Sequence, residues 1–316
     1  MEGIINLLKP AGMTSHDAVS FLRHLLGERH IGHTGTLDPM AVGVLPLCVG
    51  NTARLIEYMD GDQKAYRCEF LLGLETDTLD VWGKVLNDRR GSFAVPCRED
   101  LEAALEPLRG TILQVPPAYS ALKVNGKPLY KYARSGGEIP EIEARTVTIF
   151  KLDLVSYDEQ EGKGVMDVVC SKGTYIRSLC QEIGDTLGCG AAMSFLARTA
   201  SGPYIIQEAV TLQQLTEDWE ACMLPSDSGI GWMGELTLRQ GRDRWFSNGG
   251  YLTDSDLTAK EEPSSDHRRS GEDQEGPYKK YYRVRSAGGR FMGTAVWNEE
   301  LQQFRADKVI TKEVEA

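Results

Sequence analysis

Residues 29–46 read RHIGHTGTLDPMAVGVLP and form the most informative stretch of this chain. Four glycine or proline residues interrupt it before Val44: Gly32, Gly35, Pro39 and Gly43. Breaks at this density exclude the interior of a regular helix or strand. An apolar run over 44–50, VLPLCVG, follows directly and predicts a buried strand. We therefore expect a sharply shaped loop held against a strand of the core.

Asp38 is the single carboxylate of this stretch, and Pro39 follows it. Proline fixes its own φ and biases the residue before it toward extended geometry, so the backbone that carries Asp38 has few conformations. Such a restriction suits a reacting group on a loop. Asp-Pro is also a common turn initiator that needs no chemistry, and the residue pattern alone leaves this alternative open.

The contiguous run 32–39 resembles the Gly-His-Thr-Gly-x-Leu-Asp-Pro motif of the bacterial TruB family, the tRNA pseudouridine-55 synthases. The resemblance implies that Asp38 is the essential catalytic residue and that His33 helps to hold the opened RNA loop. It also implies an α+β pseudouridine synthase fold, with a central mixed, mainly antiparallel sheet flanked by helices.

The length of 316 residues predicts about two domains. No apolar run approaches the roughly 20 residues that a membrane span needs, and no signal segment opens the chain, because residues 3–8 already predict a strand. The seven cysteines form no CxxC pair. These features favour reduced thiols and a cytoplasmic protein.

The net charge of −11 argues at first against a nucleic-acid partner, since phosphate contacts need Lys and Arg. Two acidic segments, 207–227 and 253–276, together supply −10 of this charge. Residues 120–152 instead carry six basic against three acidic side chains, and residues 279–308 carry seven against three. The acidic excess is therefore separable from two basic segments that could meet RNA.

The remaining elements follow from periodicity and capping signals. We expect a helix capped by Ser15, a half-buried strand over 64–73, a helix over 98–108, a helix capped by Thr174 and an acidic helix over 212–222. The acids of 73–80 lack the glycine and closing glutamate of an EF-hand, so we interpret this segment as a solvated loop rather than a metal site.

Other motifs of the family have counterparts in this chain. Residues 8–15 resemble its N-terminal Lys-Pro motif, which supports the active-site loop in the family, and residues 64–67 resemble the motif whose tyrosine stacks on the target base. Residues 172–177 resemble its Lys-Gly-Thr-Tyr-Ile-Arg motif, and residues 195–199 a strand whose leucine packs near that base. The resemblance implies that Tyr66 and Arg177 are catalytic, with Arg177 paired to Asp38. It implies substrate-binding roles for the following residues: Lys9, Lys172, Tyr175 and Leu196. An arginine partner favours the ionised form of a carboxylate.

Residues 116–134 interleave aromatic and basic side chains, a combination that suits stacking on unpaired bases and contact with phosphates. An ordinary basic surface helix is the alternative on composition alone. The segment also resembles the thumb insertion of TruB enzymes, expected here over about 117–150. Its proposed RNA-binding residues are Lys123, Lys127, Tyr130, Lys131 and Arg134.

From residue 232 the chain changes to short β-like runs and resembles a PUA domain, a small RNA-binding β-barrel. We therefore expect a catalytic domain over 1–231 and a PUA-like domain over 232–316. The polar, acidic segment 254–278 is expected to be a disordered excursion between barrel strands.

The resemblance implies isomerisation of uridine 55 in the T loop of tRNA after base flipping. This isomerisation exchanges no atoms or electrons with a second reagent, so we expect no cofactor and no metal. We also expect a monomer that needs no protein partner. A non-catalytic RNA-binding or tRNA-folding protein is the alternative. A P-loop enzyme and a zinc hydrolase using His30 and His33 fit poorly, because the Gly-Lys-Ser/Thr signature and a further spaced ligand set are both missing.

Overall fold

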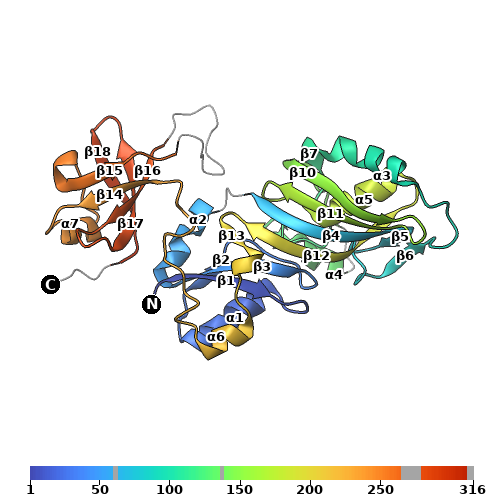
Figure 1. The fold of residues 1–316 in the computed structure, drawn as a ribbon, viewed down its shortest axis with the longest axis horizontal. Helices are drawn as coiled ribbons and strands as arrows, with labels where there is room; N and C mark the ends of the chain where they lie inside the picture. The colour runs from blue at the N-terminus through green and yellow to red at the C-terminus, as the bar shows by residue number, and fades with distance from the viewer. Residues whose placement is uncertain (60–62, 136–138, 265–278, 312–316) are drawn as a thin grey trace.

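The computed structural model describes residues 1–59, 63–135, 139–264 and 279–311. Two sheets organise this part of the chain, a large one of nine strands and a smaller one of five strands at one end (Figure 1). The strands of the large sheet are β1 (Gly3–Lys9), β2 (Ile31–His33), β3 (Val42–Val49), β4 (Lys64–Leu72), β7 (Gly110–Gln114), β10 (Arg145–Asp158), β11 (Lys163–Cys170), β12 (Ala191–Ser201) and β13 (Tyr204–Ile205).

The large sheet runs in the order β1-β3-β12-β4-β11-β10-β7, with β2 paired to β3 and β13 paired to β12. Neighbouring strands are antiparallel except for β3 and β12, which are parallel. The expected mixed, mainly antiparallel sheet is confirmed. The period-2 pattern of β4 also holds, because Tyr66, Cys68 and Phe70 are buried on one face.

Helices cover this sheet and complete its core. They are α1 (Ser15–Leu26), α2 (Ile56–Met59), α3 (Arg98–Leu105), α4 (Leu129–Arg134), α5 (Ile176–Thr186) and α6 (Leu212–Glu217), with 3₁₀ turns η1 (Gly50–Leu55), η2 (Glu106–Leu108) and η3 (Ile206–Glu208). Apolar residues of α1, α3 and α5 share one buried cluster with the inward side chains of β4, β11 and β12. Burial of this stripe, rather than intrinsic propensity, stabilises helices of such length.

Three expectations about helix ends were wrong. Thr14, not Ser15, caps α1, in a capping box with Asp17. Residue 175, not Thr174, is the N-cap of α5 and makes no side-chain cap; the Thr174 hydroxyl donates to the Ser171 carbonyl. Helix α6 ends at residue 217 rather than 222.

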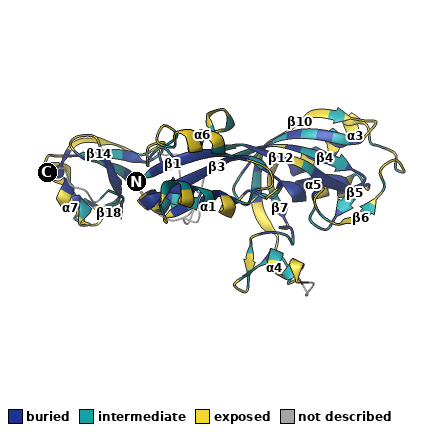
Figure 2. Cartoon of the chain, turned by 90° about the horizontal axis from the view of Figure 1, so that it is seen from below, coloured by how far each residue is buried: buried dark blue, intermediate teal, exposed yellow. Residues whose placement is uncertain are grey.

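Two small hairpins leave the large sheet. One pairs β5 (Leu74–Thr76) with β6 (Val85–Asp88), and the other pairs β8 (Lys123–Val124) with β9 (Lys127–Pro128) and leads into α4. The second hairpin departs after β7, and the chain returns to the sheet as β10. Figure 2 shows α4, part of the segment that resembles the thumb, standing off the body of the molecule.

The five-stranded sheet has the order β15-β14-β16-β17-β18. Its elements are β14 (Gly234–Leu238), α7 (Asp243–Ser247), η4 (Asp254–Asp256), β15 (Leu257–Glu261), β16 (Tyr281–Arg285), β17 (Phe291–Asn298) and β18 (Gln303–Val309). In the part of the chain described, this strand path does not close into a ring. The expectation of disorder over 254–278 is wrong for its first part, which forms η4 and β15; residues 265–278 lie outside the described residues.

The smaller sheet contacts η1 and α2 of the large-sheet part. Tyr281 packs edge-on against Tyr58 and Trp232, with ring centroids 5.4 and 5.9 Å away, inside a shared apolar cluster. The Tyr58 hydroxyl donates to the carboxylate of Asp307, and Arg54 donates to the Val309 carbonyl at 2.8 Å. This apolar and polar contact joins the two sheets.

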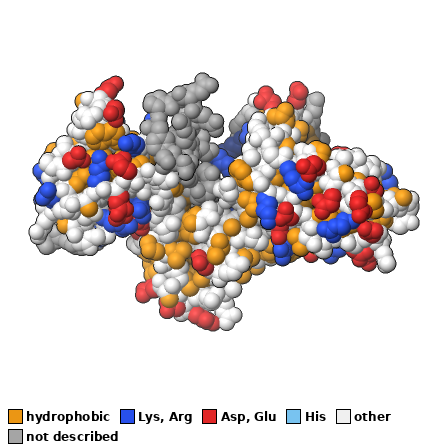
Figure 3. All heavy atoms as spheres, turned by 45° about the horizontal axis from the view of Figure 1, so that its top comes forward, with side chains coloured by type: hydrophobic (Ala, Val, Ile, Leu, Met, Phe, Trp, Pro, Cys, Tyr) orange, Lys and Arg blue, Asp and Glu red, His pale blue; other side chains and the backbone are white. Residues whose placement is uncertain are grey.

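Charged side chains of both signs share the surface shown in Figure 3, over the small sheet and over the far end of the large sheet. Many form exposed ion pairs, such as Arg67 with Asp167 at 2.7 Å. Such pairs add little stability, but their opposite charges cancel one another over much of the surface. No helix among the described residues is both long enough and apolar enough to cross a membrane.

Candidate active site

The loop between β2 and β3 carries Asp38, and buried side chains from distant parts of the chain hold its backbone. The Ser15 hydroxyl accepts from Leu37 N at 2.9 Å and donates to Leu37 O at 3.2 Å. The Lys9 ammonium donates to the carbonyls of Pro10, Met13 and Pro39 at 2.8, 2.6 and 3.4 Å. The shape of the loop is therefore set by partners that water cannot replace.

Lys9 lies at the end of β1, fully buried beneath the loop. Burial lowers its pKa to about 8, and the nearby negative charge of Asp38 opposes this shift. The structure thus places Lys9 behind the loop and outside the cavity lining, which agrees with the loop support that its motif implied and does not support the substrate contact also expected of it. It supports the loop from below.

Arg198 on β12 holds the other side of the loop and was not singled out from the sequence. Its side chain is fully buried and donates to the carbonyls of Val44, Gly35 and Thr36 at 2.7, 3.2 and 3.4 Å. The sequence feature that could have identified Arg198 is an arginine inside an apolar strand, because a buried guanidinium needs several hydrogen-bond acceptors. Gly43 faces it at φ +111°, where a Cβ would lie 2.2 Å from the Arg198 carbonyl oxygen. Only glycine permits this approach of β3 to β12.

Arg177 pairs with Asp38, as the sequence suggested. Its Nε lies 2.9 Å from Oδ2 of Asp38, and its side chain is 5% exposed against 35% for Asp38. The guanidinium also donates to the carbonyls of Thr78 and Tyr119 at 2.9 and 3.0 Å. Its orientation is therefore determined from three directions, while the carboxylate of Asp38 keeps an open side.

A second carboxylate, Asp80, lies on the far side of this arginine, with Oδ2 3.7 Å from Nη1 of Arg177. The expectation that 73–80 forms a solvated loop is wrong here, because Asp80 and Thr76 are buried. Oδ1 of Asp80 accepts from the Thr78 hydroxyl at 2.9 Å and from Trp82 N at 3.0 Å. Burial raises the pKa of Asp80, and these donors and Arg177 oppose that rise. The carboxylate is buried because it has partners.

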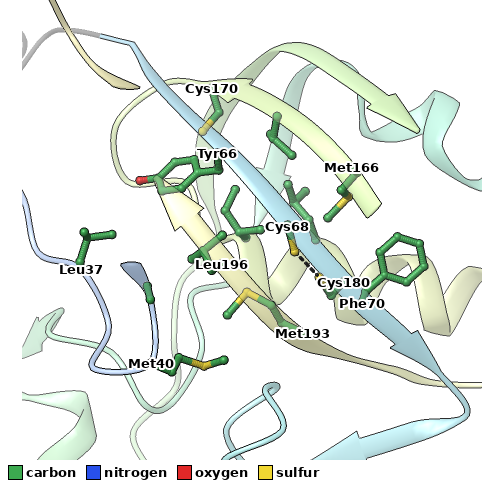
Figure 4. Packing of buried hydrophobic residues seen from close by; sticks show 14 of the residues in the cluster. Leu37, Met40, Tyr66, Cys68, Phe70, Met166, Cys170, Cys180, Met193 and Leu196 are labelled. Carbon is green, nitrogen blue, oxygen red and sulfur yellow. Dashed lines mark hydrogen bonds between the residues drawn. The ribbon is translucent and has the colours of Figure 1, made fainter. Parts of the chain in front are cut away.

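Asp38 opens into a cavity of about 760 Å³, a volume in the range of small-molecule sites. Tyr66 from β4 and Leu196 from β12 line it, and Figure 4 shows the Tyr66 ring extending toward the loop that carries Leu37. His33 and Tyr175 line it as well. Five of the predicted site residues therefore line the same cavity as Asp38: His33, Tyr66, Tyr175, Arg177 and Leu196.

Burial dominates the titration of the two ring systems nearest the loop. It raises the pKa of the Tyr66 hydroxyl, and the positive charge of Arg198 only partly opposes this. It lowers the pKa of His33, and the charges of Arg198 and Lys64 act in the same direction. Both side chains are consequently neutral near pH 7 and suited to packing or hydrogen bonding rather than to carrying charge.

The thumb contributes to the cavity unevenly. Tyr130 and Arg134 of α4 line it, with the Arg134 guanidinium 5.5 Å from the centroid of the Tyr130 ring. Three predicted thumb residues lie outside the lining, as does Lys172: Lys123, Lys127 and Lys131. Lys127 instead lies over the Tyr132 ring at 4.2 Å.

The base of the thumb is tied to the site. Tyr119 accepts from Arg177, and its hydroxyl donates to Asp77 at 3.3 Å. No group of three or more His, Cys, Asp or Glu is placed to bind a metal ion within 1–59, 63–135, 139–264 and 279–311.

Comparison with known proteins agrees with this geometry. Residues 23–176 match "TruB family pseudouridylate synthase (N terminal domain)", and residues 177–229 match "tRNA pseudouridylate synthase B C-terminal domain". Curated proteins named tRNA pseudouridine synthase B are similar to the chain. The protein from Heliobacterium modesticaldum is 50% identical over 69% of this chain and 70% of its own length. The protein from Clostridium perfringens (strain SM101) is 36% identical over 99% and 100%.

Among solved structures, an H/ACA ribonucleoprotein "bound to a substrate RNA containing 2'-deoxyuridine" superposes with a TM-score of 0.70 at 21% identity. The match covers 98% of this chain and 85% of that one and shows a shared fold. Together with the identity to the curated relatives, the loop that holds Asp38 against Arg177 leads to one conclusion: the chain belongs to the TruB family of pseudouridylate synthases.

Proposed function

We propose that this protein is a tRNA pseudouridine synthase that isomerises uridine 55 in the T loop. One observation carries the proposal: a partly open carboxylate, Asp38, is paired to the buried guanidinium of Arg177 at the wall of a cavity of about 760 Å³. The names of the curated relatives support tRNA as the substrate. The target at position 55 rests on the family motif.

The reaction breaks the bond from ribose C1′ to N1 of uracil and forms a bond from C1′ to C5; the C5 proton is lost and N1 gains one. Asp38 acts as nucleophile at C1′ or as the base that removes a ribose proton first, with Arg177 orienting it. Tyr66 is catalytic through stacking on the detached base. Its raised pKa keeps the ring neutral, and its neighbours are apolar, so the ring is suited to stacking. No cofactor is needed, because substrate and product contain the same atoms.

The other site residues receive supporting roles. His33 holds the opened RNA loop, while Tyr175 and Leu196 bound the uracil pocket. Lys9 acts through the loop that it supports, and Lys172, half-buried just before the turn into α5, is proposed to meet the RNA backbone. Since the target base is paired or stacked in tRNA, it enters the cavity by base flipping.

The thumb, about 117–150, and the C-terminal part are proposed to hold the T arm. Basic and aromatic residues of the thumb would contact phosphates and bases: Lys123, Lys127, Tyr130, Lys131 and Arg134. We divide the chain into a catalytic domain, 1–231, and a PUA-like RNA-binding domain, 232–316, whose five strands would belong to a small barrel. A monomer suffices for this division of labour, and free thiols at all seven cysteines fit action in the cytoplasm.

The test is Asp38→Asn, assayed for pseudouridine in a tRNA transcript and for tRNA binding. The amide keeps the size of the side chain but removes its charge and nucleophilicity. We expect no product and unchanged binding, whereas Asp153→Asn, an exposed acid paired with Lys151 on β10, should retain full activity. Turnover by Asp38→Asn contradicts the assignment. If the wild type binds tRNA but forms no pseudouridine, the non-catalytic RNA-binding alternative holds instead.

A further inference from the structure

Trp82 is an exposed aromatic side chain that the site described so far does not use. It follows Asp80 in the turn between β5 and β6, and it lines the same cavity as Asp38. The side chain is 61% exposed. Within the described residues, its indole N–H makes no hydrogen bond. A large apolar ring left in water at the rim of a substrate cavity indicates a binding contact rather than a packing role.

The backbone beneath this ring is tightly held. Trp82 N donates to Oδ1 of Asp80 at 3.0 Å, Gly83 N donates to the Asp80 carbonyl at 3.1 Å, and Val81 N donates to the Met193 carbonyl at 3.0 Å. Asp80 in turn faces Arg177. The backbone that carries the indole is therefore placed relative to the Asp38–Arg177 pair before substrate arrives, which lowers the ordering cost of a contact made there.

The same cavity is lined by the thumb residues Tyr130 and Arg134. A uridine that reaches Asp38 must leave its stack, and this exposes one face of the base next to it in the RNA. Aromatic side chains replace such lost stacking with little sequence preference. Trp82 offers that surface at the rim where the neighbouring nucleotide has to pass.

We propose that Trp82 stacks on the base of a nucleotide adjacent to the extruded uridine and so holds the RNA open. The inference rests on the proposed function, since it assigns the RNA contact of that same site. Trp82 is a substrate-positioning residue: it contributes to binding of the opened loop and takes no part in bond exchange.

The first experiment compares Trp82→Ala and Trp82→Phe with the wild type on a T-arm stem-loop. Stacking on one base predicts a KM about tenfold higher for Trp82→Ala, an unchanged kcat, and substantial recovery in Trp82→Phe. Leu86→Ala is the matched control, because Leu86 is 64% exposed in the same hairpin and lies outside the cavity lining. It should leave KM unchanged. RNA binding should also quench tryptophan fluorescence in the wild type and much less in Trp82→Phe.

The second experiment replaces the nucleotide directly 5′ or directly 3′ of the target uridine by an abasic one. At one of the two positions, the loss of the base should raise the wild-type KM about tenfold and the KM of Trp82→Ala less than about twofold. Equal costs in both proteins at both positions overturn the proposal, as does a KM for Trp82→Ala within about twofold of the wild type. If the wild type forms no pseudouridine, the proposed function itself has failed.

Discussion

The hydroxyl of Ser15 makes two hydrogen bonds with the backbone of Leu37, one accepted from its N–H and one donated to its carbonyl. Leu37 directly precedes Asp38, and both Ser15 and Leu37 are buried. The first turn of α1 therefore determines where the loop that carries Asp38 begins its final turn. The position of Asp38 depends on the hydroxyl of a neighbouring residue of the same cavity wall.

We predict that Ser15→Ala lowers kcat more than it raises KM. The substitution leaves a buried N–H and a buried C=O without their partner, a penalty of about 1–3 kcal/mol that the loop relieves by moving. A displacement of Asp38 by a fraction of an ångström is enough to reduce the rate by about tenfold or more. Single-turnover kinetics on tRNA and a thermal melt measure the two effects.

Thr211→Ala is the control for Ser15→Ala. Thr211 caps α6 through a capping box with Gln214, outside the cavity lining, so its loss destabilises the protein by about 1 kcal/mol as well. We expect Thr211→Ala to shift the melt and leave kcat intact. If the loss of kcat in both variants is proportional to the fall in their melting temperatures, Ser15 does not position the loop.

Arg177→Lys should lose most activity although it keeps the positive charge. The guanidinium serves Asp38, Thr78 O and Tyr119 O at once from its three nitrogens, and an ammonium on a flexible stem cannot reproduce this fork. We expect kcat to fall by at least about tenfold, measured with tRNA in excess so that binding is saturated.

The surface pair Arg67–Asp167 supplies the comparison for this arginine. Arg67 donates to the two carboxylate oxygens of Asp167 from Nε and Nη2, at 2.8 and 2.7 Å, but both side chains are largely exposed. Arg67→Lys should leave kcat within about twofold of the wild-type value and change the free energy of unfolding by no more than about 0.5 kcal/mol. An Arg177→Lys enzyme as active as Arg67→Lys means that charge alone, not geometry, is required at 177.

The sequence predicted much of this site because its motifs combine backbone breaks with single charged residues. The breaks from Gly35 to Pro39 indicated a loop, although Gly32 lies inside the short strand β2 and the expectation of a loop was wrong there. The alternation of 64–72 indicated β4, and the apolar stripe of α5 left Arg177 in the first turn able to pair with a carboxylate. These are local patterns, in which spacing along the chain determines which side chains share a face.

The residues that sequence reasoning missed depend on contacts between distant segments. Asp80 resembles any acid in a polar turn, and only the approach of Arg177 from α5 explains its burial. Arg198 finds its carbonyl acceptors more than 150 residues away in the chain. For Lys9 the motif implied support of the loop, but the sequence alone did not reveal that its ammonium is buried outside the cavity lining.

Tyr281→Ala should loosen the small sheet from the rest of the molecule. The ring packs between Tyr58 and Trp232 in the apolar cluster that both parts share. Its truncation leaves a cavity that costs about 3–5 kcal/mol. We expect faster proteolytic cleavage within 225–234 and a lower midpoint in urea.

Tyr251→Ala is the matched substitution, since Tyr251 belongs to the same part of the chain and is exposed. It should leave cleavage and the unfolding midpoint unchanged. A Tyr281→Ala protein that resists protease as well as Tyr251→Ala shows that the polar contacts of η1 and α2 hold the small sheet without the aromatic cluster.

Lys9 should make activity and stability respond to pH in opposite directions. Burial lowers its pKa from 10.5 to about 8, so between these values the folded protein has lost a proton that the unfolded chain still holds. The unfolded state binds more protons in this window, so the free energy of unfolding contributed by Lys9 rises with pH. The neutral amine, however, donates at most two hydrogen bonds to the carbonyls of Pro10, Met13 and Pro39, of which Pro39 belongs to the loop that carries Asp38, so kcat should fall as pH passes about 8.

Comparison with Lys9→Met separates this residue from other titrating groups. Methionine has a similar length and no proton to lose, and it leaves the carbonyls of Pro10 and Met13 without the lysine donor at every pH, while Pro39 O keeps only Gly12 N at 2.8 Å, so its kcat should be low throughout. Below about pH 9, where most tyrosines are still protonated, the wild-type kcat should approach the low Lys9→Met value, while the wild-type free energy of unfolding rises relative to that of the variant. A wild-type kcat that stays constant across this range contradicts the role of the ammonium in holding the loop that carries Asp38.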